Sequence, residues 1–84
     1  MISYRQQERD WLAINPLRQW RTDRNYFLKD VGAAIGVGYH SIFRWENGMS
    51  MPNDKQMIKL ETVTKIKNLR EQLEKWQIKR PKLI

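Results

Sequence analysis

A break at Gly36-Val37-Gly38 constrains the fold of this chain more than any other feature of its sequence. Apolar residues spaced for one helix face fill the range 28–35 before the break, and a second helical pattern covers 39–47 after it. Gly36 can end the first of these helices because glycine adopts a positive φ without steric cost. The sequence therefore predicts two short helices that meet at a tight turn, which is the helix-turn-helix pattern.

Capping residues place the neighbouring helices. Asn15 and Pro16 form a favourable helix start, and Asn25 tolerates the left-handed conformation that would stop this helix. Gly48 ends the helix that follows the break, and Asn53 or its neighbour can cap the next one. Beyond that point the pattern predicts one long helix or two.

The predicted fold class is all-α: a compact helix-turn-helix bundle of four to five helices with a C-terminal extension helix. We expect a helical N-terminal extension over 1–14, the helix-turn-helix domain over 15–64, and a basic amphipathic helix with a short tail over 65–84. A chain of 84 residues suits one small domain and leaves little room for an enclosed cofactor cavity.

Two apolar stripes on opposite sides divide the C-terminal part of the chain. One stripe, with Met57, Leu60 and Val63, is expected to close the core. The other has heptad-like spacing and needs a separate partner, so we predict that it is a dimerisation segment. The alternative is that it packs back onto N-terminal apolar residues, and both hold if the N-terminus joins the interface. This second stripe consists of Ile66, Leu69, Leu73 and Trp76, and its alternative partners are Tyr4, Trp11, Leu12 and Ile14.

The charge of the chain points to an acidic partner. Sixteen Lys and Arg residues against nine Asp and Glu residues give a net charge of +7, which favours nucleic acid. The surplus is uneven: residues 54–84 carry nine basic and four acidic side chains, whereas residues 28–53 carry two of each. The basic C-terminal side chains either contact phosphate or form an ordinary solvated helix face.

Several function classes are not expected. Without Cys and with a single His, the chain offers neither disulfides nor a thiolate or His-rich metal site, and we expect no metal or cofactor. No catalytic triad, paired carboxylates or phosphate-binding loop is evident, so an enzyme is not expected, and no small-molecule ligand is evident. The N-terminus lacks the apolar core of a signal peptide, and no apolar run could span a bilayer, so we predict a cytoplasmic protein without a membrane partner.

The helix after the break has two different faces. Ile42 and Trp45 point to one side and are expected in the core. The opposite side gathers polar and aromatic side chains that could hydrogen-bond or contact methyl groups in a DNA major groove. These outward residues are Tyr39, His40, Phe43, Arg44 and Asn47.

The stretch from Leu17 to about Val63 resembles the helix-turn-helix domain of phage repressors and Cro proteins, the XRE family. The matching pieces are Leu17-Arg18-Gln19-Trp20-Arg21, then Val31-Gly32-Ala33-Ala34-Ile35-Gly36-Val37, and Ile42-Phe43-Arg44-Trp45-Glu46-Asn47-Gly48 followed by Pro52. The resemblance implies base contacts from Tyr39, His40 and Arg44 with Phe43 beside them, phosphate contacts around Asn47, and an ion pair between Arg21 and Glu46.

The chain departs from the family pattern at two places. The family usually has a Thr-Gln pair at Phe27-Leu28, as a cap and a phosphate donor, and often a Ser at Gly38. We therefore expect basic and polar residues elsewhere to contact phosphate. The predicted phosphate contacts are Arg18, Lys29, Ser41, Asn47 and Lys55.

Taken together, these features predict a sequence-specific regulator that binds double-stranded DNA. We expect a transcriptional repressor of a phage or mobile element that binds an inverted repeat as a homodimer. One alternative is an assembly component such as a small terminase subunit. Another is a protein-binding helix-turn-helix module, such as an antitoxin or an inhibitor.

Overall fold

Polar side chains cap the starts of three helices in the described part of the chain. The computed structural model describes residues 3–82, and Ser3 caps the first helix, α1 (Tyr4–Ala13). The Oδ1 atom of Asn15 accepts the N–H of Arg18 at 2.8 Å and caps α2 (Pro16–Asp23). Asn53 caps α5 (Asp54–Thr64) by accepting the N–H of Gln56, and its own N–H donates to the side-chain oxygen of Gln56. The predicted helix starts at Asn15 and Asn53 are confirmed.

Left-handed residues set where most of the helices end. Asn25 has φ 57° after α2, and Gly36 has φ 77° after α3 (Leu28–Ile35). Gly48 has φ 70° just after α4 (Tyr39–Glu46). The chain then separates α5 from α6 (Leu69–Ile78) with left-handed Lys65 and Asn68, so the C-terminal stretch is two helices.

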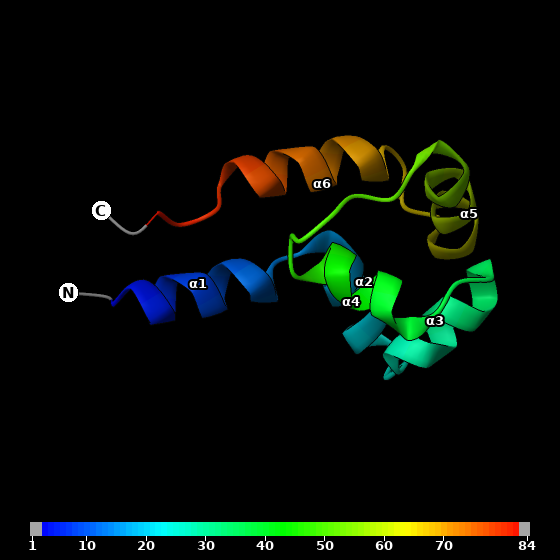
Figure 1. Ribbon diagram of the computed structural model, residues 1–84, viewed down its shortest axis with the longest axis horizontal. Helices are drawn as coiled ribbons and strands as arrows, with labels where there is room; N and C mark the ends of the chain where they lie inside the picture. The colour runs from blue at the N-terminus through cyan, green and yellow to red at the C-terminus, as the bar shows by residue number, and fades with distance from the viewer. Residues whose placement is uncertain (1–2, 83–84) are drawn as a thin grey trace.

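The described residues form an all-helical bundle, as predicted, with two distinguishable parts (Figure 1). We call α2 to α5 the head and the antiparallel pair of α1 and α6 the arm. The extents of 41, 24 and 19 Å reflect the arm, which projects from the head. Residues 1–2 and 83–84 of the predicted terminal segments lie outside the described residues.

The core of the head is built from the residues that helical periodicity placed there. Ile42 and Leu60 are fully buried, and Met57 is 2% exposed. The first C-terminal stripe therefore closes the core, with Val63 packed at its edge. The cluster continues into the arm through α6. Its buried members are Leu17, Val31, Ile35, Ile42, Trp45, Met57, Leu60, Leu69 and Leu73, while Trp20 is partly buried against it.

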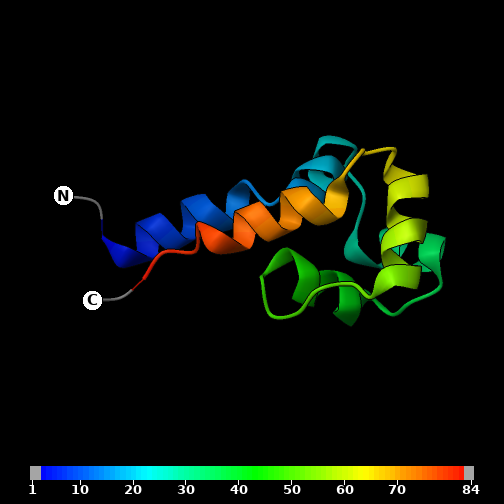
Figure 2. The same cartoon turned by 90° about the horizontal axis from the view of Figure 1, so that it is seen from above.

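The arm is held by two tryptophans from opposite ends of the chain. The rings of Trp11 and Trp76 stack with centroids 4.0 Å apart and planes 1° from parallel. Each indole N–H donates to the backbone carbonyl of the other residue at 2.7 Å. Figure 1 and Figure 2 show α1 and α6 running in opposite directions, with the start of α1 near the end of α6.

The second apolar stripe, predicted to form a dimer interface, is covered within one chain. Leu69 and Leu73 are fully buried, Trp76 is 3% exposed, and Ile66 packs against the core as a partly buried residue. The stripe packs back through Trp11, as in the alternative, although Ile14 remains 52% exposed. Heptad-like spacing predicts that one face of a helix is buried against another helix. It does not predict whether that helix belongs to a second copy or to the same chain.

A carboxylate fixes the joint between α5 and α6. Glu61 on α5 accepts the backbone N–H of Leu69, the first residue of α6, at 3.1 Å. This bond replaces the missing side-chain cap at Asn68. Thr64 accepts the N–H of Ile66 at 3.2 Å and steadies the turn before it. The joint thereby aims α6 back along α2 and α1.

Candidate nucleic-acid interface

A tight joint sets α4 against α3. After the left-handed Gly36, the N–H of Val37 bonds to the carbonyl of Gly32 at 2.9 Å. A Cβ atom on Gly32 would lie 2.7 Å from the carbonyl oxygen of Val37, so a side chain there would push the turn away. Glycine at this position lets the chain fold back closely and fixes the angle between the two helices.

One face of α4 enters the core and the other is open. Ile42 is fully buried and Trp45 is 4% exposed, as the helical pattern predicted. On the other side, Tyr39 is 51% exposed and Phe43 is 47% exposed. About half of each ring is therefore open to solvent and available to a partner.

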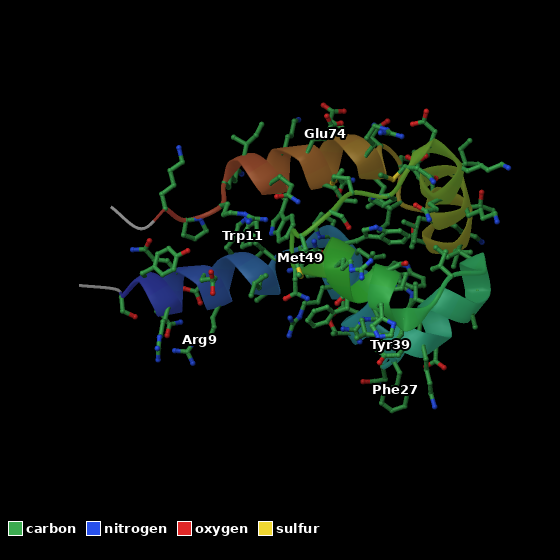
Figure 3. The ribbon with its side chains drawn as sticks, viewed as in Figure 1. Arg9, Trp11, Phe27, Tyr39, Met49 and Glu74 are labelled. Atoms are coloured by element: carbon green, nitrogen blue, oxygen red, sulfur yellow. The ribbon has the colours of Figure 1, made fainter. Side chains whose placement is uncertain are left out.

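The four residues predicted to contact bases share this open face of α4: Tyr39, His40, Phe43 and Arg44, all of them exposed. The rings of Tyr39 and His40 stack with centroids 4.0 Å apart. Figure 3 shows Tyr39 pointing away from the core. The face offers a guanidinium, an imidazole, a phenol and an apolar ring on one helix, which matches the mixture of groups on base edges in a major groove.

The predicted phosphate contacts are spread over several elements. Lys29 on α3 and Lys55 in the first turn of α5 are exposed, whereas Arg18 on α2 and Ser41 on α4 are half-buried. Asn47 follows α4, and both its backbone N–H and its side-chain amide donate to the carbonyl of Phe43, at 3.0 and 2.8 Å. Asn47 thus keeps one side-chain N–H for another acceptor. These five residues come from four helices and the turn after α4, and Lys29 lines a groove together with Tyr39.

A two-pronged ion pair fixes the far end of α4. Arg21 on α2 reaches Glu46 with Nε to Oε2 at 2.7 Å and Nη2 to Oε1 at 2.9 Å, and its Nη1 donates to the carbonyl of Tyr26. The Glu46 side chain is 2% exposed. The hydrogen bond to Glu46 raises the pKa of Arg21 above its ordinary value, so Arg21 keeps its charge throughout the neutral range. This is the pair that the family resemblance implied.

A second polar tie was not anticipated from the sequence. Asn15 is fully buried, and in addition to capping α2 it donates its side-chain N–H to the carbonyl of Trp45 at 3.3 Å. One amide therefore joins the start of α2 to the last turn of α4. Sequence analysis identified the cap, but the tertiary bond depends on a contact between elements thirty residues apart.

Phe27 is the residue that sequence analysis left out of the site. It occupies the N-cap of α3 without a side-chain cap and is 67% exposed. Its own N–H is satisfied by Asp30 at 2.7 Å. Ser, Thr, Asn or Asp at an N-cap stabilises a helix by about 1 kcal/mol relative to an apolar residue, so Phe is a poor choice for the helix alone. An aromatic residue at the start of a helix was the feature of the sequence that could have identified Phe27 as a candidate site residue.

Phe27 and Tyr39 border an open groove of about 480 Å³ between the start of α3 and the start of α4. Figure 3 shows both rings on the same side of the molecule. The groove therefore continues the exposed face of α4. Its remaining lining comes from Arg21, Leu28 and Lys29.

The described residues were also compared with the requirements of a membrane-spanning helix and of a metal site. No helix in 3–82 has the length and apolar character needed to cross a membrane. Within the same range, no three acidic or histidine side chains are grouped so that they could hold a metal ion.

The fold and the open face of α4 define a helix-turn-helix protein of the DNA-binding class. The sequence model of the helix-turn-helix family HTH_3 matches residues 17–72, which is more than half of the chain. The protein therefore belongs to this helix-turn-helix family, the Cro and phage-repressor type, a DNA-binding family that is not typically enzymatic. Searches of curated proteins and of solved structures gave no match.

Proposed function

We propose that this protein is a transcription regulator, acting as a repressor, that reads double-stranded DNA by placing α4 in the major groove. The observation that supports this proposal is the open face of α4, where four side chains with base-reading chemistry lie on a helix whose opposite face is anchored to the rest of the head. The anchors are the ion pair of Glu46 and the bond from Asn15 to Trp45. Rigid support of this kind keeps a reading helix in one orientation.

Each side chain on the open face has a role that follows from its chemistry. Arg44 is suited to a bidentate contact with guanine, the commonest specific contact in a major groove. His40 and Tyr39 can hydrogen-bond to base edges, and Phe43 can cover a thymine methyl group. Phosphate contacts fix the register of the helix on the duplex and contribute affinity without sequence preference. Lys29 and Lys55 are the exposed cations among the predicted phosphate contacts.

The proposal includes a homodimer on an inverted repeat. One α4 helix reads only a half-site, and two copies related by a twofold axis place two such helices about 34 Å apart along one side of the duplex. Leu69, Leu73 and Trp76 are buried within the chain. The proposed dimer must therefore use other surfaces of the head or arm.

A protein-binding role is the second candidate, because the open surface is rich in aromatic residues. Phe27, Tyr39 and Phe43 are each about half exposed or more, and such rings are enriched where proteins meet. In that role the protein would show only weak, salt-sensitive attraction to DNA.

Selection of bound sequences from a random duplex library tests the proposal. We expect the protein to enrich an inverted repeat, and Arg44→Ala to lose the preference for one base pair in each half-site. Failure to enrich any sequence would overturn the DNA-reading function and favour the protein-binding role. Enrichment of a single unrepeated half-site would overturn the dimer.

Light scattering on the same samples separates the repressor from the assembly component. A repressor is expected to form a dimer on its site. An octamer or a larger ring would instead favour a packaging component such as a small terminase subunit.

A further inference from the structure

The ring of Phe27 stands at a place where neither helix stability nor solvation favours it. It leads α3 as the N-cap residue, makes no side-chain cap and is 67% exposed. Polar residues are preferred at this position because their side chains accept a free backbone N–H of the helix. Sequences depart from such local rules most often at functional sites. Phe27 therefore calls for a contact that the free protein does not show.

The surroundings of Phe27 combine an apolar wall with one available cation. Tyr39 borders the groove together with Phe27, and Leu28 contributes to its lining. The Lys29 Nζ atom lies 5.9 Å from the centroid of the Phe27 ring. Arg21 also lines the groove, but its guanidinium is committed to Glu46 and to the carbonyl of Tyr26. Lys29 is thus the lining cation that remains exposed for a ligand.

We infer that this groove holds a deoxyribose of the DNA backbone, with its adjoining phosphate on Lys29. The inference rests on the proposed DNA-binding function. A deoxyribose presents C–H groups to an aromatic face and always carries phosphate beside it, so the pair of an apolar wall and a neighbouring cation fits one sugar-phosphate unit. Thymine methyl groups lie on the floor of the major groove, where α4 and not the start of α3 would reach them.

The proposed contact between Phe27 and the sugar is apolar packing and involves no hydrogen bond. Phe27 has no side-chain donor for a phosphate oxygen, so its contribution comes from removing C–H surface from water. Such a contact is independent of base sequence and of salt, whereas the contact of Lys29 releases counterions and depends on salt. It also favours DNA over RNA at this position, because a ribose would bring a 2′-hydroxyl against the ring.

Affinity measurements on two duplexes test the sugar contact. Phe27→Ala is expected to weaken binding to the selected site and to a random duplex by a similar factor, about threefold to tenfold, with an unchanged salt slope. Lys29→Ala should lower the magnitude of the slope of log affinity against log salt by about 0.9. Ile78→Ala on α6 is the matched control, because Ile78 is an apolar residue with 80% exposure outside the groove, and it should change neither quantity.

Single-nucleotide replacements locate the contact. In duplexes with one ribonucleotide at a time, we expect a backbone position where the wild type loses affinity and Phe27→Ala loses none. If replacing a thymine by deoxyuridine weakens binding of the wild type but not of Phe27→Ala, Phe27 contacts a thymine methyl group and the inference is overturned. The inference is also overturned if no ribonucleotide position distinguishes the wild type from Phe27→Ala. If the wild type shows no sequence-specific binding, the proposed function itself fails. Thermal unfolding of Phe27→Ala checks that the variant remains folded.

Discussion

The head and the arm of this protein are held together by different chemistry. In the head, polar groups tie the helices at chosen points, through Arg21 to Glu46 and through Asn15 to the carbonyl of Trp45. In the arm, two stacked indoles supply both the apolar contact and the hydrogen bonds. Hydrogen bonds and ion pairs have strict geometry, so they orient α4. The stacked indoles mainly cover the apolar side of α6 that the head leaves open.

The two parts meet at the turn that ends α4. Gly48 lies so close to the arm that a Cβ atom there would be 2.7 Å from Trp11 and 3.2 Å from Trp76. Arg80 places its guanidinium over the Trp11 ring at 4.8 Å and donates to the carbonyl of Gly48. The arm therefore supports the end of the reading helix from outside the head. Its first helix also lies outside residues 17–72 matched by the family.

Loss of the tryptophan stack should give the largest change. Trp76→Ala removes a buried ring and the hydrogen bond from its indole N–H to the carbonyl of Trp11, so the free energy of unfolding should fall by about 3 to 5 kcal/mol. Urea denaturation measures this loss. The ratio of specific to random DNA affinity should stay unchanged while the protein is folded, because the ties of α4 remain.

Sedimentation of the same variant examines the second apolar stripe. Since the stripe is covered within one chain, the mass of folded Trp76→Ala should equal that of the wild type. A fall from dimer to monomer would restore the stripe as the subunit interface.

Loss of the buried carboxylate should affect both stability and reading. Glu46→Ala leaves the Arg21 guanidinium partly buried without its partner, and we expect the free energy of unfolding to fall by about 3 kcal/mol. The preference for the selected site should fall as well, because α4 loses an anchor. Glu71→Ala is the control: its exposed pair with Lys75 at 3.1 Å should contribute less than about 0.5 kcal/mol. An equal effect of the two variants would contradict the special role of the head pair.

Local signals in the sequence predicted most of the head. Asn15 and Asn53 at helix starts, and Asn25 and Gly36 at helix ends, act through their own backbone or close neighbours, and all four behave as expected. The inward and outward faces of α4 follow from periodicity alone. The ion pair of Arg21 came from the family resemblance, since no local rule joins residues so far apart.

Choices between distant partners could not be predicted in the same way. Periodicity showed that Leu73 and Trp76 need a cover but could not say whether Trp11 of the same chain or a second copy provides it. The bond from Asn15 to Trp45 depends on how α2 and α4 are placed. Phe27 carried a local signal, an aromatic residue at a helix start, but its groove exists only after α3 and α4 have met.

Removal of the proposed guanine contact should change reading without changing the fold. Arg44 is exposed on α4, so Arg44→Ala should leave the free energy of unfolding within about 0.5 kcal/mol of the wild type. Affinity for the selected site should fall by about 1 to 3 kcal/mol, with little change on random duplex. Titrations on both duplexes measure this difference. An equal loss on both would reassign Arg44 to phosphate.

The smallest expected effects separate the lysines of the head from those of the arm. Lys55 lies in the first turn of α5, where the proposed complex places phosphate, so Lys55→Ala should lower the magnitude of the salt slope by about 0.9. Lys75 lies on α6 and pairs with Glu71, so Lys75→Ala should leave the slope unchanged. Equal changes would show that the basic C-terminal part also contacts phosphate. The unchanged slope that we expect for Lys75 would instead assign its charge to a solvated helix face. The excess charge of the C-terminal part would then speed the encounter with DNA without contacting phosphate in the complex.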